Sequence, residues 1–143
     1  MNLTFHRLCT ANIEDAAHVI IEAYKMPPWC IVWSAEQAQK SITVSMNNPQ
    51  DRCFAAFEGN VFVGVLIGRV QIYAEDEFYI MQLATHPQYS KKGIGRRLLT
   101  YCTEQIKSEG ITHIELLTAP HDTEFYEKCE FNSSDAINFW KDL

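Results

Sequence analysis

The chain has 143 residues, 47% of them hydrophobic and 21% charged, which predicts one globular domain spanning residues 1–143 and excludes a disordered chain. Twelve Lys and Arg against eighteen Asp and Glu give a net charge of −6, which argues against general nucleic-acid binding and favours a cationic partner. No apolar run suits a membrane span or a signal peptide, and five scattered cysteines form no C-x-x-C motif, so we expect a cytoplasmic protein with reduced thiols and no metal site.

The first part of the chain predicts one strand followed by two helices. The expected elements are a strand at Leu3–Leu8, a helix from Asn12 to about Tyr24, and a helix from Ser34 to about Asn47. Apolar residues recur every three to four positions after Asn12, a residue type that caps helices, and Met26-Pro27-Pro28 ends the pattern. Ser34-x-x-Gln37 matches the capping box that starts a helix.

The middle of the chain has the pattern of β-strands, and the rest mixes helices with short strands. The expected elements are strands at 53–57, 61–73 and 78–85, a helix at 93–109, a strand at 113–118, a helix at 123–129 and a last strand at 136–140. Glu58-Gly59-Asn60 marks a hairpin turn, and Gly110 stands where a glycine ends a helix. The order β-α-α-β-β-β-α-β-α-β predicts an α/β fold with a mixed sheet flanked by helices.

The segment at residues 86–97, called the basic loop below, carries the strongest functional signal. It follows a predicted strand, and Gly93-x-Gly95 opens the next helix. Four cations accompany the two glycines, namely Lys91, Lys92, Arg96 and Arg97. Unpaired N–H groups of a first helical turn, beside glycines that let the backbone come close, suit a phosphate. The P-loop motif fails because Val65-Leu66 follows the Gly59–Gly64 spacing, and the dinucleotide motif lacks its third glycine.

The basic loop resembles motif A of the GNAT superfamily of acetyltransferases, whose core is Q/R-x-x-G-x-G/A. Here the core reads Ser90-x-x-Gly93-x-Gly95 within His86–Leu99. About thirty residues downstream, the run Phe125-Tyr126-Glu127-Lys128-Cys129-Glu130-Phe131 resembles the family's motif B, L/F-Y-x-K-x-G-F. Both motifs have the family's order and spacing, and the predicted element order is similar to that fold over the whole chain.

The resemblance implies a fold in which the fourth and fifth strands splay apart and hold acetyl-CoA, the co-substrate, between them. The backbone of the fourth strand would bind the pantetheine arm, and the basic loop would bind the pyrophosphate. The implied cofactor-binding residues are Leu83, Ala84, Thr85, Ser90, Lys91, Lys92, Gly93, Ile94, Gly95 and Arg96. The implied reaction is direct transfer of the acetyl group to an amine.

The transfer needs a proton donor and a base. A tyrosine, with a reference pKa near 10, can protonate the leaving thiolate, and the resemblance gives this role to Tyr126. The acceptor ammonium must lose a proton before it can attack. The candidate base for this step is Glu115 on the predicted fifth strand. The acidic turn at residues 75–77, His121 and ordered water are alternatives to Glu115.

The acceptor is expected to bind beside the first two helices, which cover the acceptor face of the family fold. The candidate residues are the aromatic cluster, defined as Tyr24, Trp29 and Trp33. Aromatic walls suit a cationic amine, while the alternative is that these rings anchor a loop to the core. The acceptor would be an amine of a small molecule or of a peptide.

The sequence departs from the family pattern at several positions. Ser90 replaces the usual Gln or Arg, Lys91 stands where glycine is frequent, and Glu130 replaces the glycine before Phe131. An asparagine often found about seven residues before the tyrosine is replaced by the Ala119-Pro120 region. These changes leave cofactor affinity and the turn after the last helix open.

We therefore expect an acetyl-CoA-dependent N-acetyltransferase acting on a small-molecule amine or a peptide N-terminus. The alternatives are a protein-lysine acetyltransferase and a non-catalytic sensor that binds acetyl-CoA. Neither nucleic acid nor a membrane is expected as a partner, and a homodimer is left open.

Overall fold

The computed structural model describes residues 2–143, and its elements follow the predicted order up to the fourth helix. The strands are β1 (Leu3–Arg7), β2 (Asp51–Glu58), β3 (Val61–Ile72), β4 (Asp76–Thr85) and β5 (Ile114–Leu116). The α-helices are α1 (Ile13–Lys25), α2 (Ala35–Met46), α3 (Ile94–Ser108) and α4 (Thr123–Lys128). Short 3₁₀ turns lie at Thr10–Asn12, Pro87–Tyr89 and Pro120–Asp122.

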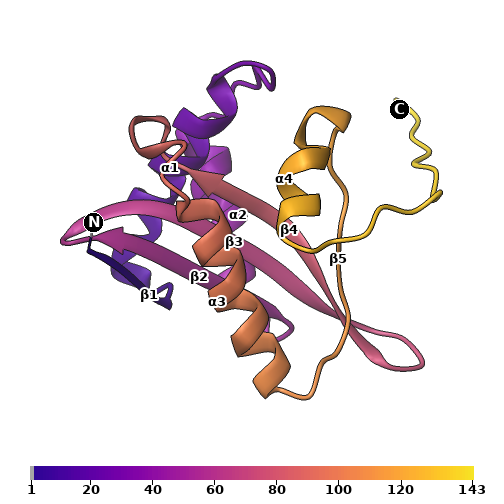
Figure 1. Ribbon diagram of the computed structural model, residues 1–143. Coiled ribbons are helices and arrows are strands. Elements are labelled where there is room, and N and C mark those ends of the chain that lie inside the picture. The colour runs from indigo at the N-terminus through magenta and orange to yellow at the C-terminus, as the bar shows by residue number, and fades with distance from the viewer. Residues whose placement is uncertain (1) are drawn as a thin grey trace.

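The strands form one sheet in the order β1-β2-β3-β4-β5 (Figure 1). Neighbouring strands from β1 to β4 are antiparallel, whereas β5 pairs in parallel with β4. A parallel pair requires a crossover connection, and α3 provides it between β4 and β5. The structure therefore confirms the predicted α/β fold with a mixed sheet.

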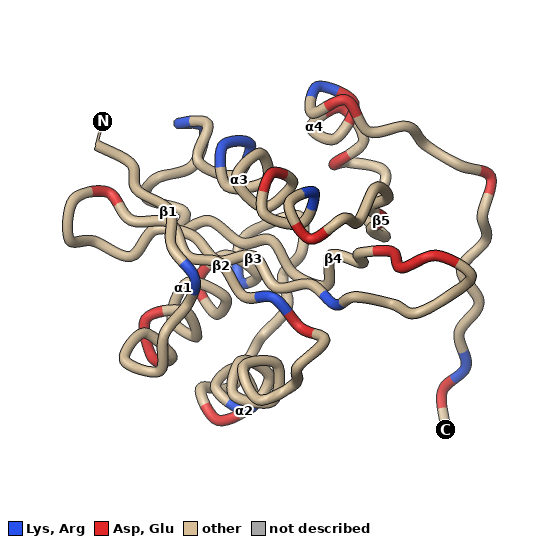
Figure 2. The backbone as a smooth tube through the Cα atoms, turned by 90° about the horizontal axis from the view of Figure 1, so that it is seen from below, with Lys and Arg blue, Asp and Glu red and all other residues tan. Residues whose placement is uncertain are grey.

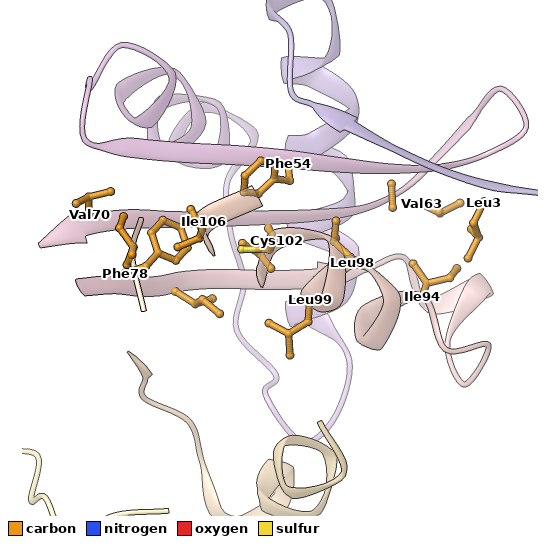
Figure 3. Packing of buried hydrophobic residues seen from close by; sticks show 14 residues of the cluster. Leu3, Phe54, Val63, Val70, Phe78, Ile94, Leu98, Leu99, Cys102 and Ile106 are labelled. Atoms are coloured by element: carbon orange, nitrogen blue, oxygen red, sulfur yellow. The ribbon is translucent and has the colours of Figure 1, made fainter. Parts of the chain in front are cut away.

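Helices cover both faces of the sheet, with α1 and α2 on one side and α3 and α4 on the other (Figure 2). Each face buries its own hydrophobic cluster, because successive side chains of a strand point to opposite faces. Phe54 and Leu98 are fully buried on the α3 side (Figure 3), and Ile20 and Ile42 on the α1–α2 side. Among residues 2–143, no helix combines the length and apolar character that crossing a membrane requires.

The predicted helix starts are formed in two different ways. At α2, Ser34 Oγ accepts a hydrogen bond from the Gln37 N–H at 3.0 Å, which confirms the predicted cap. At α1, Asn12 is the residue before the helix, but its side chain does not cap it. Its Oδ1 instead accepts a hydrogen bond from Cys9 Sγ at 2.8 Å, because a 3₁₀ turn precedes the helix here.

The predicted strand at residues 136–140 is wrong. This segment pairs with no strand among the described residues, and Ile137, Phe139 and Trp140 are exposed. A strand needs partners for its N–H and C=O groups, and the tail runs away from the sheet (Figure 1), so alternation alone does not form one. The fifth strand is also shorter than the predicted 113–118, because its pairing with β4 covers three residues.

Candidate active site

The two edges of β4 are paired to different extents. Toward β3, pairing continues to the end of the strand, where Leu83–Thr85 lie opposite residues 64–66. Toward β5, pairing covers Phe78–Ile80 and stops at Leu116. The β5-facing edge of Leu83–Thr85 therefore has no strand partner within the described residues, and we call it the free edge of β4. An extended ligand can bind such an edge as an additional strand.

The basic loop connects the end of β4 to the start of α3. Gly93 directly precedes α3 with a φ of 76°, a left-handed conformation that favours glycine, and a Cβ there would meet nothing within 4 Å. The N–H groups of Ile94, Gly95 and Arg96 lie in the first helical turn, where no intrahelical carbonyl is available to them. Such amides, at the positive end of the helix dipole, suit a phosphate in the open space beside Gly93.

The cations of the basic loop are not neutralised by acidic side chains. Lys92 Nζ lies 5.3 Å from the centre of the Tyr89 ring, and the Arg97 guanidinium lies 5.5 Å from that of Phe5. Across residues 2–143, neither of these two nor Lys91 nor Arg96 forms an ion pair. Their charges are therefore available to an anion.

Two departures from the family pattern adopt the backbone conformation that glycine favours. Lys91 has a φ of 61° and Glu130 a φ of 68°. After α4, the Glu130 N–H donates to the Glu127 carbonyl at 3.0 Å and the Phe131 N–H donates to the Tyr126 carbonyl at 2.9 Å. This bond pair is the glycine-type helix ending known as the Schellman motif. The turn left open by the sequence is thus formed with a strained glutamate.

The start of α3, the end of β4 and α4 meet at Gly95. A Cβ at Gly95 would lie 3.5 Å from the Phe125 ring and 3.6 Å from Thr85 Oγ1. These are ordinary van der Waals distances, so the three elements pack closely here and a Cβ would still be accommodated. This packing places Tyr126, the next residue of α4, near the candidate cofactor-binding residues.

Tyr126 is half-buried against the hydrophobic cluster that also contacts Leu83. Its ring packs edge-on against Phe125 and Phe131, with centres 5.0 and 5.7 Å apart. Burial raises the pKa of the Tyr126 phenol well above the ordinary 10.0, and the charges of Asp122 and Tyr24 raise it further. The phenol therefore stays protonated at neutral pH, as a proton donor must.

The aromatic cluster approaches the same place from the opposite face of the sheet. The Tyr24 ring centre lies 5.8 Å from that of Trp29 and 6.4 Å from that of Trp33. The Trp29 ring in turn packs against that of His121, just before α4, with ring centres 4.6 Å apart. Burial and then the Asp122 carboxylate raise the pKa of Tyr24 as well. The Asp122 charge therefore raises the pKa of both Tyr24 and Tyr126.

Glu115 lies apart from these tyrosines in an exposed group on the neighbouring strands. Its Oε1 is 3.4 Å from His113 Nε2. Glu77 lies beside them, and one side-chain nitrogen or oxygen atom from each of the three residues lies within 4.8 Å of the other two. Position 115 is opposite Tyr79, well before the free edge of β4. No hydrogen bond or ion pair joins Glu115 to Tyr24 or Tyr126 in the described part of the chain.

Sequence reasoning missed Asp122, whose charge raises the pKa of both tyrosines. Its Oδ2 accepts a hydrogen bond from Thr118 Oγ1 at 3.2 Å, and its Oδ1 lies 3.8 Å from His121 Nε2. No motif marks it, because Asp122 and Tyr24 are almost a hundred residues apart in the chain. The packing of Trp29 on His121 is the contact that joins the two segments.

Comparison with known proteins places this arrangement in context. The family model described as Acetyltransferase (GNAT) family matches residues 15–131. A search of curated protein sequences gave no significant match.

Solved structures share the fold at low sequence identity. An aminoglycoside acetyltransferase, meta-AAC0020, from an uncultured soil metagenomic sample in complex with sisomicin has a TM-score of 0.78 and 21% identity, covering 99% of this chain and 96% of that one. Glucosamine-6-phosphate N-acetyltransferase from Arabidopsis thaliana has a TM-score of 0.77 and 12% identity, covering 100% and 99%. AAC(6')-Iy in complex with the bisubstrate analogue CoA-S-monomethyl-acetylneamine has a TM-score of 0.82 and 10% identity, covering 100% and 99%.

Proposed function

The chain belongs to the GNAT family of acetyltransferases, and from this premise we propose that it transfers the acetyl group of acetyl-CoA to a primary amine of a small molecule or a peptide N-terminus. Residues 1–143 would act as one catalytic domain, and the homodimer stays open. The observation that carries the proposal is the free edge of β4, whose Thr85 lies near the start of α3 and near α4 at Gly95.

The proposed cofactor site combines backbone and charge. The edge formed by Leu83, Ala84 and Thr85 would bind the amides of the pantetheine arm in the manner of an added strand. The basic loop would bind the pyrophosphate through the first-turn amides of α3 and its unpaired cations. The side chain of Ser90 is short, so phosphate binding would depend mainly on the backbone from Lys91 to Arg96.

The proposed reaction is one nucleophilic substitution at the thioester carbon. The amine nitrogen attacks this carbon, a C–N bond forms, and the carbonyl oxygen becomes an oxyanion that a backbone N–H of β4 can stabilise. The C–S bond then breaks and the sulfur takes the proton of the Tyr126 phenol. The nitrogen gives up its extra proton, and solvent returns a proton to Tyr126.

The base would act through water. Glu115 is held by His113 in the exposed group beside Glu77, without a contact to Tyr126 in the described residues. A chain of waters would therefore be needed to carry a proton from the amine to this carboxylate. The aromatic cluster would form the acceptor wall, since Trp29 packs on His121 just before α4, the helix that carries Tyr126.

Acetyl-CoA turnover with a panel of amines tests the proposal. Chromatographic detection of CoA, with mass spectrometry of the acetylated amine, is preferable to thiol reagents because Cys9 and Cys30 are exposed. The panel should include amino sugars, since two neighbours are named as acetyltransferases of aminoglycosides and of glucosamine-6-phosphate. It should also include a peptide N-terminus and a peptide lysine, which separates the lysine alternative.

The sensor alternative predicts a different combination of results. Acetyl-CoA would raise the melting temperature by binding the folded state, yet no amine would yield a product. Product formation above the uncatalysed rate would exclude the sensor. Absence of a thermal shift with acetyl-CoA would contradict both readings.

A further inference from the structure

A pocket of about 300 Å³ lies between α2 and the strands β3 and β4, on the face opposite α3. Trp33 of the aromatic cluster forms part of its wall, and Lys40, Ser41 and Gln82 supply polar groups. Gln82 directly precedes the free edge of β4. The pocket therefore adjoins the proposed acceptor wall.

A β-bulge directs Gln82 into this pocket. The β3–β4 register shifts between Ile67 and Gly68, so Met81 has no partner on β3. Met81 packs with the cluster under α1 and α2, and the side chain of Gln82 bonds to Ser41 of α2. Two successive side chains thus point to the same face, which an unbroken strand does not allow.

One polar atom of the pocket lacks a partner. Gln82 Nε2 donates to Ser41 Oγ at 3.1 Å, whereas Gln82 Oε1 is buried and accepts no hydrogen bond from any residue that the structure describes. A buried acceptor left unpaired is costly, so a donor from outside the chain is expected there. Ser41 Oγ accepts the Gln82 bond and keeps its own proton for another acceptor.

The charge of the pocket decides which donor fits. No carboxylate lines the pocket, and Arg69, one of its two cations, is already bonded to both carboxylate oxygens of Asp51. Lys40 has no ion pair within the described chain. An ammonium group is therefore disfavoured here. A hydroxyl group fits, because it can donate to Gln82 Oε1 and accept from Lys40 or Ser41.

We propose that this pocket binds a hydroxyl group of the acceptor and that Gln82 makes the enzyme prefer amines that carry one. The proposal rests on the proposed function, because the amine must reach the acetyl group beside the free edge of β4. The hydroxyl would occupy the pocket while the amine lies toward Tyr24 and Tyr126. Gln82 is then a specificity determinant with no part in the chemical step.

The test compares glucosamine with cyclohexylamine, a ring amine that lacks hydroxyls. We expect wild type to have a kcat/KM at least about tenfold higher for glucosamine, since leaving the buried acceptor unpaired costs about 1–3 kcal/mol. Gln82→Met keeps the length of the side chain and removes the acceptor, so it should abolish this preference by raising KM for glucosamine alone. Gln82→Glu keeps acceptor oxygens and should restore part of the preference.

Controls separate a binding role from a structural one. Gln71→Met makes the same exchange on β3 outside the pocket and should leave the glucosamine preference unchanged. Gln82→Met also removes the Nε2 bond to Ser41 Oγ, so its thermal stability should match that of Ser41→Ala, which loses the same bond. An equal kcat/KM ratio in wild type and Gln82→Met would overturn the proposal and leave a bound water only.

Binding without turnover distinguishes the two proposals. In NMR titrations with glucosamine, the side-chain NH₂ resonances of Gln82 should shift in wild type, whether or not product forms. A shift without acetylation of any amine contradicts the proposed function and retains the pocket. Acetylation of glucosamine without this shift retains the function and overturns the pocket. Ser41→Ala, which removes the hydroxyl that accepts from Gln82 Nε2 but keeps Gln82 Oε1, provides a second variant if Gln82→Met does not fold.

Discussion

The two sides of the free edge of β4 differ in their chemical groups and in how the chain forms them. The basic loop is a continuous segment of exposed cations and backbone amides, at the start of a helix. The other side is assembled from Tyr24, Trp29, His121 and Tyr126, which come from opposite faces of the sheet and bury two phenols. Amides and cations suit the binding of an anion, whereas half-buried phenols with a raised pKa keep their protons. Changes in the loop should therefore alter acetyl-CoA affinity, and changes at Tyr126 should alter turnover.

The largest expected effect is on kcat in Tyr126→Phe. The exchange keeps the ring that packs on Phe125 and Phe131 and removes the phenol proposed as proton donor. General acid catalysis contributes about 10²–10⁴-fold, so kcat should fall within this range while acetyl-CoA affinity changes little. Single-turnover kinetics, which isolate the chemical step from product release, provide the measurement.

Tyr101→Phe is the matched control, because Tyr101 packs on Phe5 and Phe54, away from the free edge. It should leave kcat unchanged. A Tyr126→Phe enzyme with wild-type single-turnover rates would remove the phenol from the mechanism and leave the ring as packing.

The next effect is on acetyl-CoA affinity in Gly93→Val. A branched side chain would occupy the open space beside the first-turn amides and would strain a residue at φ 76°. Loss of one hydrogen bond to a charged group costs about 1.5–3 kcal/mol, so affinity should fall at least about tenfold. Isothermal titration with acetyl-CoA measures the change.

Gly59→Val separates strain from binding. Gly59 also has a positive φ, of 57°, and open space beside it, but it lies in the β2–β3 turn. Both variants should lose a similar free energy of unfolding. Wild-type affinity in folded Gly93→Val would show that the phosphates bind elsewhere.

Smaller, stabilising effects are expected where side chains adopt the left-handed conformation. This conformation costs a residue other than glycine about 1–2 kcal/mol. Replacement by glycine removes this cost, but glycine also gives the unfolded chain more freedom, which reduces the gain in stability. Lys91→Gly and Glu130→Gly should each raise the free energy of unfolding by roughly 0.5–1 kcal/mol. Denaturant unfolding checks both.

The same pair separates the two sides of the site. Lys91→Gly also removes a cation of the basic loop, so acetyl-CoA affinity should decrease and depend less on salt. Glu130→Gly leaves the loop intact and should keep wild-type affinity. Equal affinities in both variants would contradict a role of the Lys91 charge.

The contrast between a continuous segment and a site assembled from distant segments also explains what the sequence could predict. The Ser34 cap, the hairpins and the Gly93 helix start depend on neighbours in the chain, so local patterns predicted them. The strand predicted at 136–140 failed because pairing is decided by what lies alongside, and alternation does not reveal that. Among the site residues, the packing of Trp29 on His121, the effect of Asp122 on the pKa of two tyrosines and the orientation of Gln82 depend on segments far apart in the chain. The bulge at Met81 leaves no clear sequence signal, and it alone decides which face Gln82 occupies.

The smallest expected effect concerns kcat, which should not change with pH while Tyr126 stays protonated. Burial raises the pKa of Tyr126 above 10.0, so its phenol should remain protonated and kcat should not decline through its ionisation up to pH 10. Stability depends on pH through two buried thiols. Burial raises the pKa of Cys53 to about 11 and that of Cys102 to about 12, whereas both have the ordinary 9.0 in the unfolded chain. The free energy of unfolding should therefore decline from about pH 9, where the thiols of the unfolded chain begin to ionise and those of the folded chain do not.

The pH profile therefore needs kcat and unfolding to be measured together at low temperature, where the enzyme stays folded. Tyr126 adds its own loss of stability only above pH 10. A decline of kcat centred below pH 10 that disappears in Tyr126→Phe would place the phenol in its ordinary range. The buried side of the site would then be as open to solvent as the basic loop, because burial is the largest cause of the raised pKa.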